Sequence, residues 1–415
     1  MSSRLLHLTN SNNMLTAIKT NIKMEEQLKN SATCQVLYAD KLADKLINIT
    51  ISESREGVLV TGGAGFIGSY VAAALLKRRR KVILFDIFNQ ETSGSDEKHN
   101  NVLVLKKIAK EVNEKLTSID IKAELYVIIG DIRDRHSIDE VINNPLFNVT
   151  SAIHAAAMVD HRRSISSSKE YFDVNISGTA ILLDMLGKSG KIKRVVQASS
   201  SSVFGEVYHQ NTKLDEDSPR RPLNPYGVSQ VASDALAHCY SHIYQMQVFL
   251  IRIPSCFGHG ASPNMWIRIL MEKIANGEVI KKIGTGEATR TWLYIDDIVD
   301  CFMKAFFYGL RESNSSAIVS MNAPPLSLYE EFNTGSQEGP LTLNRVIETA
   351  EKVMGKKANI QMIKAVPKGD AKFSGVYDYS KAKRVLGWQP LYNLEQGMTV
   401  LKKQHSDANT NKHRS

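Results

Sequence analysis

The chain has 415 residues, of which 43% are hydrophobic and 23% charged, and it carries a formal net charge of +9 at pH 7. These values are ordinary for a globular protein with a sizeable core. The charge suits anionic ligands and does not indicate a nucleic-acid partner. No apolar run approaches the length that crosses a bilayer, so we predict no membrane span.

The cysteines are few and widely spaced, at Cys34, Cys239, Cys256 and Cys301. Because no CxxC pair occurs, this spacing argues against a zinc site or a disulfide framework, and we predict no bound metal and a reducing, cytoplasmic location. Residues 1–56 are expected to form a partly disordered N-terminal extension. Residues 1–24 contain no Asp or Glu, so organelle import stays open beside the plainer interpretation of a variable extension.

The first predicted elements form a strand–turn–helix–strand unit. Residues 57–61 are a short apolar run, which is typical of a buried parallel strand. A glycine-rich turn follows, then a helical pattern at 71–76 and a second apolar run at 81–86. The sequence therefore predicts a parallel βαβ unit at the start of the folded region.

The same alternation continues along the next part of the chain. Further strands are predicted at 124–129, 151–157, 194–199 and 247–252, with helices at 103–116, 165–188 and 226–245. Alternation of this kind predicts the α/β class, with a doubly wound parallel Rossmann sheet.

From residue 252 onward the pattern changes to short mixed elements, which predicts a smaller α/β lobe at the C-terminal end. Helices are expected near 264–275, 295–309, 342–354 and 380–386. Residues 311–330 are predicted to be a loop insertion.

The glycine-rich turn has the spacing of a dinucleotide-binding site. The segment TGGAGFIG places Gly62, Gly65 and Gly68 between a predicted strand and a predicted helix. The start of that helix offers N–H groups and a partial positive charge to phosphates. Asp86 ends the second predicted strand, where a carboxylate can accept both ribose hydroxyls and would repel the 2′-phosphate of NADP, so NAD is the expected cofactor.

These observations predict how the chain is organised. The expected parts are the extension at 1–56, an NAD-binding Rossmann domain at 57–251, a substrate-binding lobe with some interleaving at 252–403, and a disordered tail at 404–415.

Several motifs together resemble the extended short-chain dehydrogenase/reductase family, and within it the NAD-dependent nucleotide-sugar epimerases and dehydratases. The resemblance covers roughly residues 57–403 and is greatest to UDP-glucuronate 4-epimerases. It is carried by TGGAGFIG at 61–68, GDIRD at 130–134, HAAA at 154–157, NISGT at 175–179, ASSSSVFG at 198–205, NPYG at 224–227, RTWLYIDD at 290–297 and DYSKA at 378–382.

The resemblance implies NAD contacts spread over the predicted Rossmann sheet. The residues it implies are Gly62, Gly65, Phe66, Ile67, Gly68, Asp86, Asp131, Ile132, Ala155, Ala156, Ala157, Asn175, Tyr226 and Gln230. It also implies a UDP-sugar substrate and a homodimer.

The resemblance further implies the chemistry. In the family a tyrosine takes a hydroxyl proton from the sugar while a hydride passes to NAD, and the hydride then returns to the other face of the keto sugar. Tyr226 matches this base, and Ser200 matches the residue that hydrogen-bonds the reacting oxygen. A serine at the end of a strand and a tyrosine at the start of a helix, found together, support a ligand-binding role more strongly than either residue alone.

Position 230 departs from the family pattern, because Gln230 stands where the family has a lysine one helical turn after the tyrosine. An amide can still hydrogen-bond the nicotinamide ribose, but it cannot supply the charge that lowers the tyrosine pKa. A nearby unit charge corresponds to about two to three pKa units. We therefore expect a weakened base at Tyr226.

The predicted substrate contacts are polar and basic. Arg290 matches the family arginine that binds the diphosphate, and a guanidinium suits that anion. Ser200, Ser201, Ser202 and Ser255 are the other predicted contacts. The glucuronate subgroup has an arginine where this chain has a serine at 262, which weakens the assignment of the sugar.

Three hypotheses follow from these residues. The first is an NAD-dependent nucleotide-sugar epimerase that oxidises a sugar carbon transiently, expected to be C4 of a UDP-hexose or UDP-hexuronate. The second is a non-catalytic protein that binds NAD or a sugar nucleotide, and Gln230 is the feature that separates it from the first. The third is an NAD-dependent dehydrogenase or reductase of another small molecule, against which Arg290 and the long C-terminal lobe argue.

Overall fold

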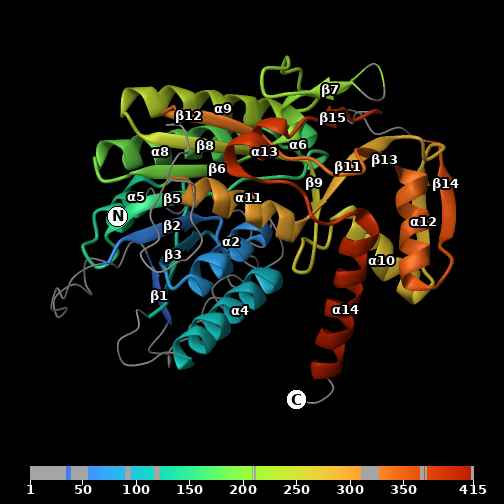
Figure 1. Ribbon diagram of the computed structural model, residues 1–415, viewed down its shortest axis with the longest axis horizontal. Helices are drawn as coiled ribbons and strands as arrows, with labels where there is room; N and C mark the ends of the chain where they lie inside the picture. The colour runs from blue at the N-terminus through green and yellow to red at the C-terminus, as the bar shows by residue number, and fades with distance from the viewer. Residues whose placement is uncertain are drawn as a thin grey trace, which may run out of the picture.

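A computed structural model of the chain describes residues 34–38, 55–88, 95–115, 122–207, 209, 212–309, 327–364, 369 and 372–412. Its centre is an eight-stranded parallel sheet with the strand order β1-β4-β3-β2-β5-β6-β8-β12 (Figure 1). The strands are β1 (Cys34–Tyr38), β2 (Gly57–Thr61), β3 (Lys81–Asp86), β4 (Glu124–Ile129), β5 (Val149–His154), β6 (Arg194–Ser200), β8 (Gln247–Ile253) and β12 (Tyr329–Asn333). The predicted doubly wound parallel sheet is confirmed.

The strand order reverses beside β2. From β2 the chain passes to β3 and β4 on one side, and β5 and β6 follow on the other. In open parallel sheets, ligands bind at such a switch point, outside the carboxyl ends of the strands. The edge formed by the ends of β2, β3, β5 and β6 is therefore where a site is expected.

Helices cover both faces of the sheet, which explains why its central strands are almost fully buried. One face packs against α2 (Phe66–Lys77), α4 (Ser95–Glu114) and α11 (Ile295–Phe307). The other packs against α5 (Arg135–Ile142), α8 (Thr179–Lys188) and α9 (Pro225–Ile243), and the two layers are plain in Figure 1.

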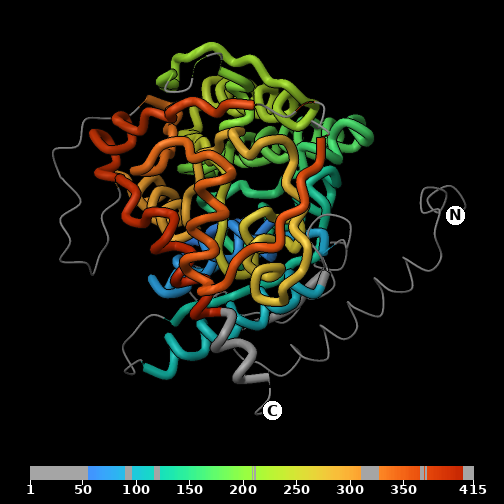
Figure 2. The backbone as a smooth tube through the Cα atoms, turned by 90° about the vertical axis from the view of Figure 1, so that its right-hand side faces the viewer, coloured from blue at the N-terminus to red at the C-terminus, as the bar shows by residue number. Residues whose placement is uncertain are grey.

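Most of the C-terminal elements gather at one end of the sheet, at the right of Figure 1, and this end faces the viewer in Figure 2. The strands there are β9 (Ser255–Phe257), β10 (Val279–Ile283), β11 (Thr289–Tyr294), β13 (Pro340–Thr342) and β14 (Asn359–Ile363). The helices there are α10 (Trp266–Asn276), α12 (Leu343–Met354) and α14 (Leu394–Lys412), whereas α13 (Ser380–Leu386) packs against α11 and β12. The helices α10, α11, α12 and α13 correspond to the four helices predicted for this part of the chain.

The two halves interleave through strands that cross between them. The strand β12 from the C-terminal half joins the main sheet beside β8, and β7 (Lys213–Leu214) pairs with β15 (Val376–Tyr377). Shorter segments complete the described chain: α6 (Arg163–Ser166), α7 (Ser168–Phe172), the π-helix η3 (Asp173–Gly178) and the 3₁₀ helix η4 (Ser201–Val203).

The expectations about the chain ends and the loop insertion are either corrected by the structure or lie largely outside the described residues. Part of the N-terminal extension forms β1 at the sheet edge, and most of the rest lies outside the described residues. The predicted loop insertion also falls largely outside them, although β12 begins at Tyr329. The helix α14 continues to Lys412, into the segment expected to be a disordered tail. No helix in the described part of the chain is long and apolar enough to span a membrane.

Candidate active site

The glycine-rich turn joins β2 to α2 at the carboxyl edge of the sheet. Gly62 has a φ of +66°, and a Cβ at this position would lie 2.6 Å from the Ala156 backbone nitrogen. A Cβ on Gly68 would lie 2.2 Å from the Gly62 carbonyl oxygen. Gly65 is the N-cap of α2, whose first turn holds no acidic side chain. The turn therefore leaves a cradle beside the helix N-terminus, and its N–H groups suit a pyrophosphate.

Phe66 and Ile67 begin α2, but their side chains turn away from this cradle. Both pack against the core of the C-terminal elements. The Phe66 and Tyr70 rings lie edge to face, with their centroids 5.8 Å apart. Any contact of these two residues with a phosphate would therefore use the backbone N–H groups.

Asp86 ends β3 next to the cradle and lies in a dense set of polar contacts. Its carboxylate accepts hydrogen bonds from the N–H groups of Ala64 (3.1 Å) and Phe88 (3.2 Å). Its Oδ1 also accepts from the Lys98 ammonium of α4 at 2.8 Å, and both side chains of this ion pair are almost fully buried. A buried carboxylate fixed by three donors is pre-oriented for a ribose, and Lys98 is a partner that sequence reasoning missed.

The segment after β5 is fixed to the cradle by His154. Its Nδ1 lies 2.7 Å from the Thr61 hydroxyl and its Nε2 lies 2.9 Å from the Thr179 hydroxyl. Burial lowers the pKa of His154 to about 4, so the imidazole is neutral and bridges two hydroxyls. Ala155 donates its N–H to the Thr61 carbonyl at 3.1 Å. Ala155 and Ala156 therefore run beside the glycine turn. The predicted contact of Ala155, Ala156 and Ala157 with the cofactor stays a prediction.

Asp131 and Ile132 follow β4 on the other side of the switch point. The Asp131 carboxylate is held by the Arg133 guanidinium, with a shortest contact of 2.6 Å. Ile132 is buried against η3, where Gly178 leaves room for it, since a Cβ on Gly178 would lie 2.8 Å from Ile132 Cδ1. Neighbouring residues therefore hold both the charged Asp131 side chain and the apolar Ile132 side chain in place after β4.

Asn175 lies in the π-helical segment η3 and is buried. Its amide accepts from the Met158 N–H (2.8 Å) and donates to the Met158 carbonyl (3.0 Å) and the Ser229 hydroxyl (2.9 Å). In the structure this side chain ties the segment after β5 to α9. Its predicted contact with the cofactor stays a prediction.

Tyr226 lies in the first turn of α9. The helix begins at Pro225, and the Asn224 side chain accepts a hydrogen bond from the Gly227 N–H at 2.9 Å, so the helix start is sharply defined. Ser200, at the end of β6, hydrogen-bonds the Tyr226 hydroxyl. The Ser200 hydroxyl is in turn held 3.1 Å from both the N–H and the hydroxyl of Ser202. The predicted tyrosine and serine therefore meet.

The electrostatic surroundings of Tyr226 work against ionisation. Burial raises the pKa of Tyr226 to about 12, and the hydrogen bond with Ser200 offsets this only in part. Asp234 and the Cys256 thiol raise the pKa further, and no basic side chain in the described chain contributes to lowering it. Gln230 is 5% exposed one turn along the same helix. The structure therefore provides no substitute for a charge at position 230.

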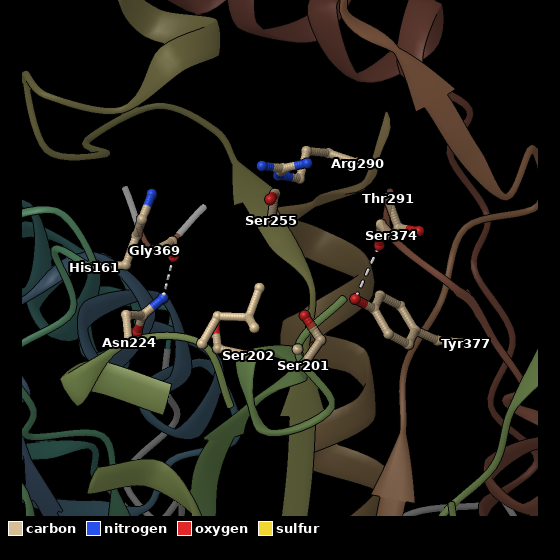
Figure 3. A pocket seen from close by; sticks show the side chains of 12 residues that line it. His161, Ser201, Ser202, Asn224, Ser255, Arg290, Thr291, Gly369, Ser374 and Tyr377 are labelled. Carbon is tan, nitrogen blue, oxygen red and sulfur yellow. Dashed lines mark hydrogen bonds between the residues drawn. The ribbon is translucent and has the colours of Figure 1, made fainter. Parts of the chain in front are cut away.

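A pocket beside this pair collects the predicted substrate contacts. Figure 3 shows Arg290 next to Ser255 on one wall, and Ser201 and Ser202 on the facing wall. None of the described residues that line it is acidic. A pocket with a guanidinium and several hydroxyls suits an anionic, hydroxyl-rich ligand.

Tyr226 and Ser200 adjoin this pocket through neighbouring residues. Ser200, Tyr226 and Gln230 are not part of the described lining, whereas the adjacent Ser202 and Asn224 are. Since Tyr226 is 9% exposed, only a small part of its ring is accessible to a ligand.

Several lining residues were missed by sequence reasoning. His161 lies in the segment between β5 and α6, and Thr291, Ser374 and Tyr377 come from the C-terminal half. The Ser374 and Tyr377 hydroxyls lie 2.9 Å apart (Figure 3). Only Thr291 carried a signal, because it follows Arg290 directly. Among the described residues, no group of three or more His, Cys, Asp or Glu side chains is arranged to hold a metal ion.

The chain was compared with known proteins. Residues 59–401 match the family described as GDP-mannose 4,6 dehydratase. A UDP-glucuronate 4-epimerase from Thermodesulfobacterium geofontis is 31% identical over 343 residues, which cover 82% of this chain and 93% of that protein. A UDP-glucuronate 4-epimerase from Arabidopsis thaliana is 28% identical, covering 82% and 74%.

Among solved structures, the chain is similar to a UDP-glucuronic acid 4-epimerase from Bacillus cereus in complex with UDP-glucuronic acid and NAD. The TM-score is 0.68 at 26% sequence identity, and the match covers 83% of this chain and 97% of that one. With its Rossmann sheet, glycine cradle and tyrosine–serine pair, the chain belongs to the GDP-mannose 4,6 dehydratase family, a group of extended short-chain dehydrogenases that includes NAD-dependent nucleotide-sugar epimerases.

Proposed function

We propose that this protein is an NAD-dependent nucleotide-sugar epimerase that inverts C4 of a UDP-hexose or UDP-hexuronate. The observation that carries the proposal is the meeting of Tyr226 and Ser200 beside the pocket that contains Arg290. The epimerase names of two similar proteins, which this chain covers over 93% and 97% of their lengths, support it.

The glycine turn and Asp86 are the proposed contacts for NAD. The cradle of Gly62, Gly65 and Gly68 would hold the pyrophosphate of NAD, and Asp86 with Lys98 the adenosine ribose. When bound there, NAD would supply the acceptor and donor of a hydride for the sugar carbon. These assignments fit the geometry, because Cβ atoms at Gly62 and Gly68 would collide with neighbouring backbone, so the close approach of the turn to the helix needs glycine at both positions.

Arg290 would bind the diphosphate, and Ser201, Ser202 and Ser255 the sugar hydroxyls or a C6 carboxylate. Ser200 would hydrogen-bond the C4 oxygen while Tyr226 removes and later returns its proton. Because the proton goes back to the sugar, the cycle needs no net proton release. Buried surroundings keep water from the oxidised sugar.

A second candidate, a non-catalytic NAD or sugar-nucleotide binder, is favoured by one observation. The charge that would lower the Tyr226 pKa is missing, and burial raises that pKa to about 12. An unassisted phenol of this kind ionises rarely at neutral pH, so binding without turnover is the natural alternative.

The test starts with purified protein. Any bound nucleotide is released and identified, and the protein is incubated with NAD and, in turn, UDP-glucuronate, UDP-glucose and UDP-galactose. C4 inversion that is lost in Tyr226→Phe supports the epimerase. Binding of NAD and UDP-sugar without inversion at high protein concentration would point to the binder, and net reduction of NAD with another alcohol would point to a dehydrogenase.

Two further parts of the proposal follow from the family and the cysteine pattern. We expect a homodimer, to be checked by light scattering, and a cytoplasmic location, to be checked by fractionation.

A further inference from the structure

The buried face of α9 carries three polar residues, which begin with Tyr226 and end with a carboxylate. Tyr226, Gln230 and Asp234 follow one another at intervals of four residues, so they share one face of the helix. Their exposed fractions are 9%, 5% and 2%. The carboxylate of Asp234 therefore lies two helical turns behind the catalytic phenol, beyond the position where the family has its lysine.

Asp234 is poorly compensated for a buried carboxylate. Its Oδ2 lies 3.4 Å from both Nε and Nη2 of Arg252, whereas the same guanidinium approaches Oε2 of Glu331 to 2.5 Å. Glu331 also accepts from Arg220 at 2.6 and 2.7 Å. The cations of this cluster are therefore engaged chiefly by Glu331, and Asp234 is left with the long contacts to Arg252 and with the Ser199 hydroxyl.

The groups that face the two ends of this arrangement come from several elements. Those that act on Asp234 are Arg252 of β8, Ser199 of β6, Glu331 of β12 and Arg220 before α9. Those that act on Tyr226 are Ser200 of β6, Cys256 of β9 and Asp234 itself, and the Tyr171 ring lies edge-on to it. Among the groups that act on Tyr226, Asp234 is the carboxylate, and Glu331 is not one of these groups.

We infer that Asp234 is a positioning residue for the reaction: its carboxylate opposes ionisation of Tyr226 across the neutral Gln230, and neutralising it makes the phenol a more effective base. The inference rests on the proposed epimerase function. Burial raises the pKa of Asp234 to about 6, with Arg252 opposing the rise, so the carboxylate is ionised at neutral pH and becomes protonated in mild acid.

The size of the effect follows from the helix geometry. Eight residues span about 12 Å along a helix axis. At that separation and an effective dielectric constant of ~20, a unit charge shifts a pKa by about one unit, which is a roughly tenfold change in the phenolate fraction at fixed pH.

The experiment compares Asp234→Asn with Glu331→Gln as the matched control. Both substitutions neutralise a buried carboxylate that touches Arg252, but only Asp234 acts on Tyr226. We expect Asp234→Asn to raise kcat/KM for C4 inversion up to about tenfold near pH ~8. The ratio to the unsubstituted protein should fall toward one below pH ~5, where Asp234 of the unsubstituted protein is protonated and as neutral as the asparagine. Glu331→Gln should give no such pH-dependent ratio.

A ratio that is the same at every pH, or one that Glu331→Gln reproduces, overturns the inference. If Asp234→Asn does not fold, the pH dependence of kcat/KM in the unsubstituted protein tests the inference. As Asp234 ionises, the rise of kcat/KM with pH should become less steep, by about tenfold in total. A profile without that inflection overturns the inference.

A second readout does not depend on turnover. The ultraviolet absorbance of tyrosinate is titrated in the NAD complex of each protein, and the titration of its Tyr226→Phe counterpart is subtracted. We expect the ionisation of Tyr226 to begin about one pH unit lower in Asp234→Asn than in the unsubstituted protein. A shift without any epimerisation would overturn the proposed function and keep this inference; epimerisation without a shift would do the reverse.

Discussion

Replacing Gln230 with lysine should strengthen the catalytic base. Position 230 is one turn from Tyr226 on the same buried face of α9, and side chains so placed have Cβ atoms about 6 Å apart. A unit charge at that distance and an effective dielectric constant of ~20 corresponds to about 3 kcal/mol, or about two pKa units. Burial of the ammonium and its attraction to Asp234, four residues further on, reduce this gain. We therefore expect kcat/KM to rise by roughly tenfold to a hundredfold near neutral pH.

The assay is the initial rate of C4 inversion of a UDP-sugar, with NAD affinity and thermal unfolding measured on the same samples. Val228→Lys is the matched control, because Val228 lies on the same turn of α9 but is 43% exposed and points to solvent. Gln230→Met tests whether size alone matters. If Gln230→Lys folds and binds NAD as before but turns over no faster than Val228→Lys, the electrostatic reasoning about Tyr226 is wrong.

Three other outcomes are expected. Lys98→Met should weaken NAD binding about tenfold in calorimetry, because Asp86 loses its buried partner, whereas Lys107→Met on the exposed side of α4 should not. Gly62→Ala should abolish NAD binding or folding, because a Cβ would lie 2.6 Å from a backbone nitrogen, in addition to the strain of a φ of +66°. Gly277→Ala, with a similar φ of +72° but open space around it, should lower the unfolding free energy by only about 1 kcal/mol. Because the pKa of His154 is lowered to about 4 in the folded state, the neutral ring stabilises the fold above the unfolded pKa, and about 3 kcal/mol should be lost as pH falls from about 6.5 to 4; denaturant titrations of His154→Gln should lack this loss.

The parts of the fold that depend on local pattern could be predicted from sequence. Strands such as 81–86 are buried along their whole length, so their central residues form an apolar run that is recognisable in the sequence. The glycine turn was predictable for a similar reason, because a close backbone approach admits only glycine and leaves a fixed spacing. The meeting of Tyr226 and Ser200 followed from the resemblance rather than from spacing.

The parts that depend on distant partners could not be predicted. The strand β12 reads YEEFN, and its two glutamates argue against a buried strand. Glu331 is tolerated in the sheet because Arg220 and Arg252, far away in sequence, neutralise it. Lys98 was missed because it lies in a polar stretch, and only the packing of α4 shows that it meets Asp86.

The addition of β12 to the main sheet also limits how the molecule can move. A polypeptide cut near residue 252 would leave the edge of β8 bare and remove the glutamate that neutralises Arg252. Rigid-body opening about a single hinge between the two halves would have to break the same hydrogen-bonded ladder. Access for a sugar nucleotide must therefore come from local rearrangement around the pocket mouth, and isolated fragments of this protein should aggregate rather than fold as independent units.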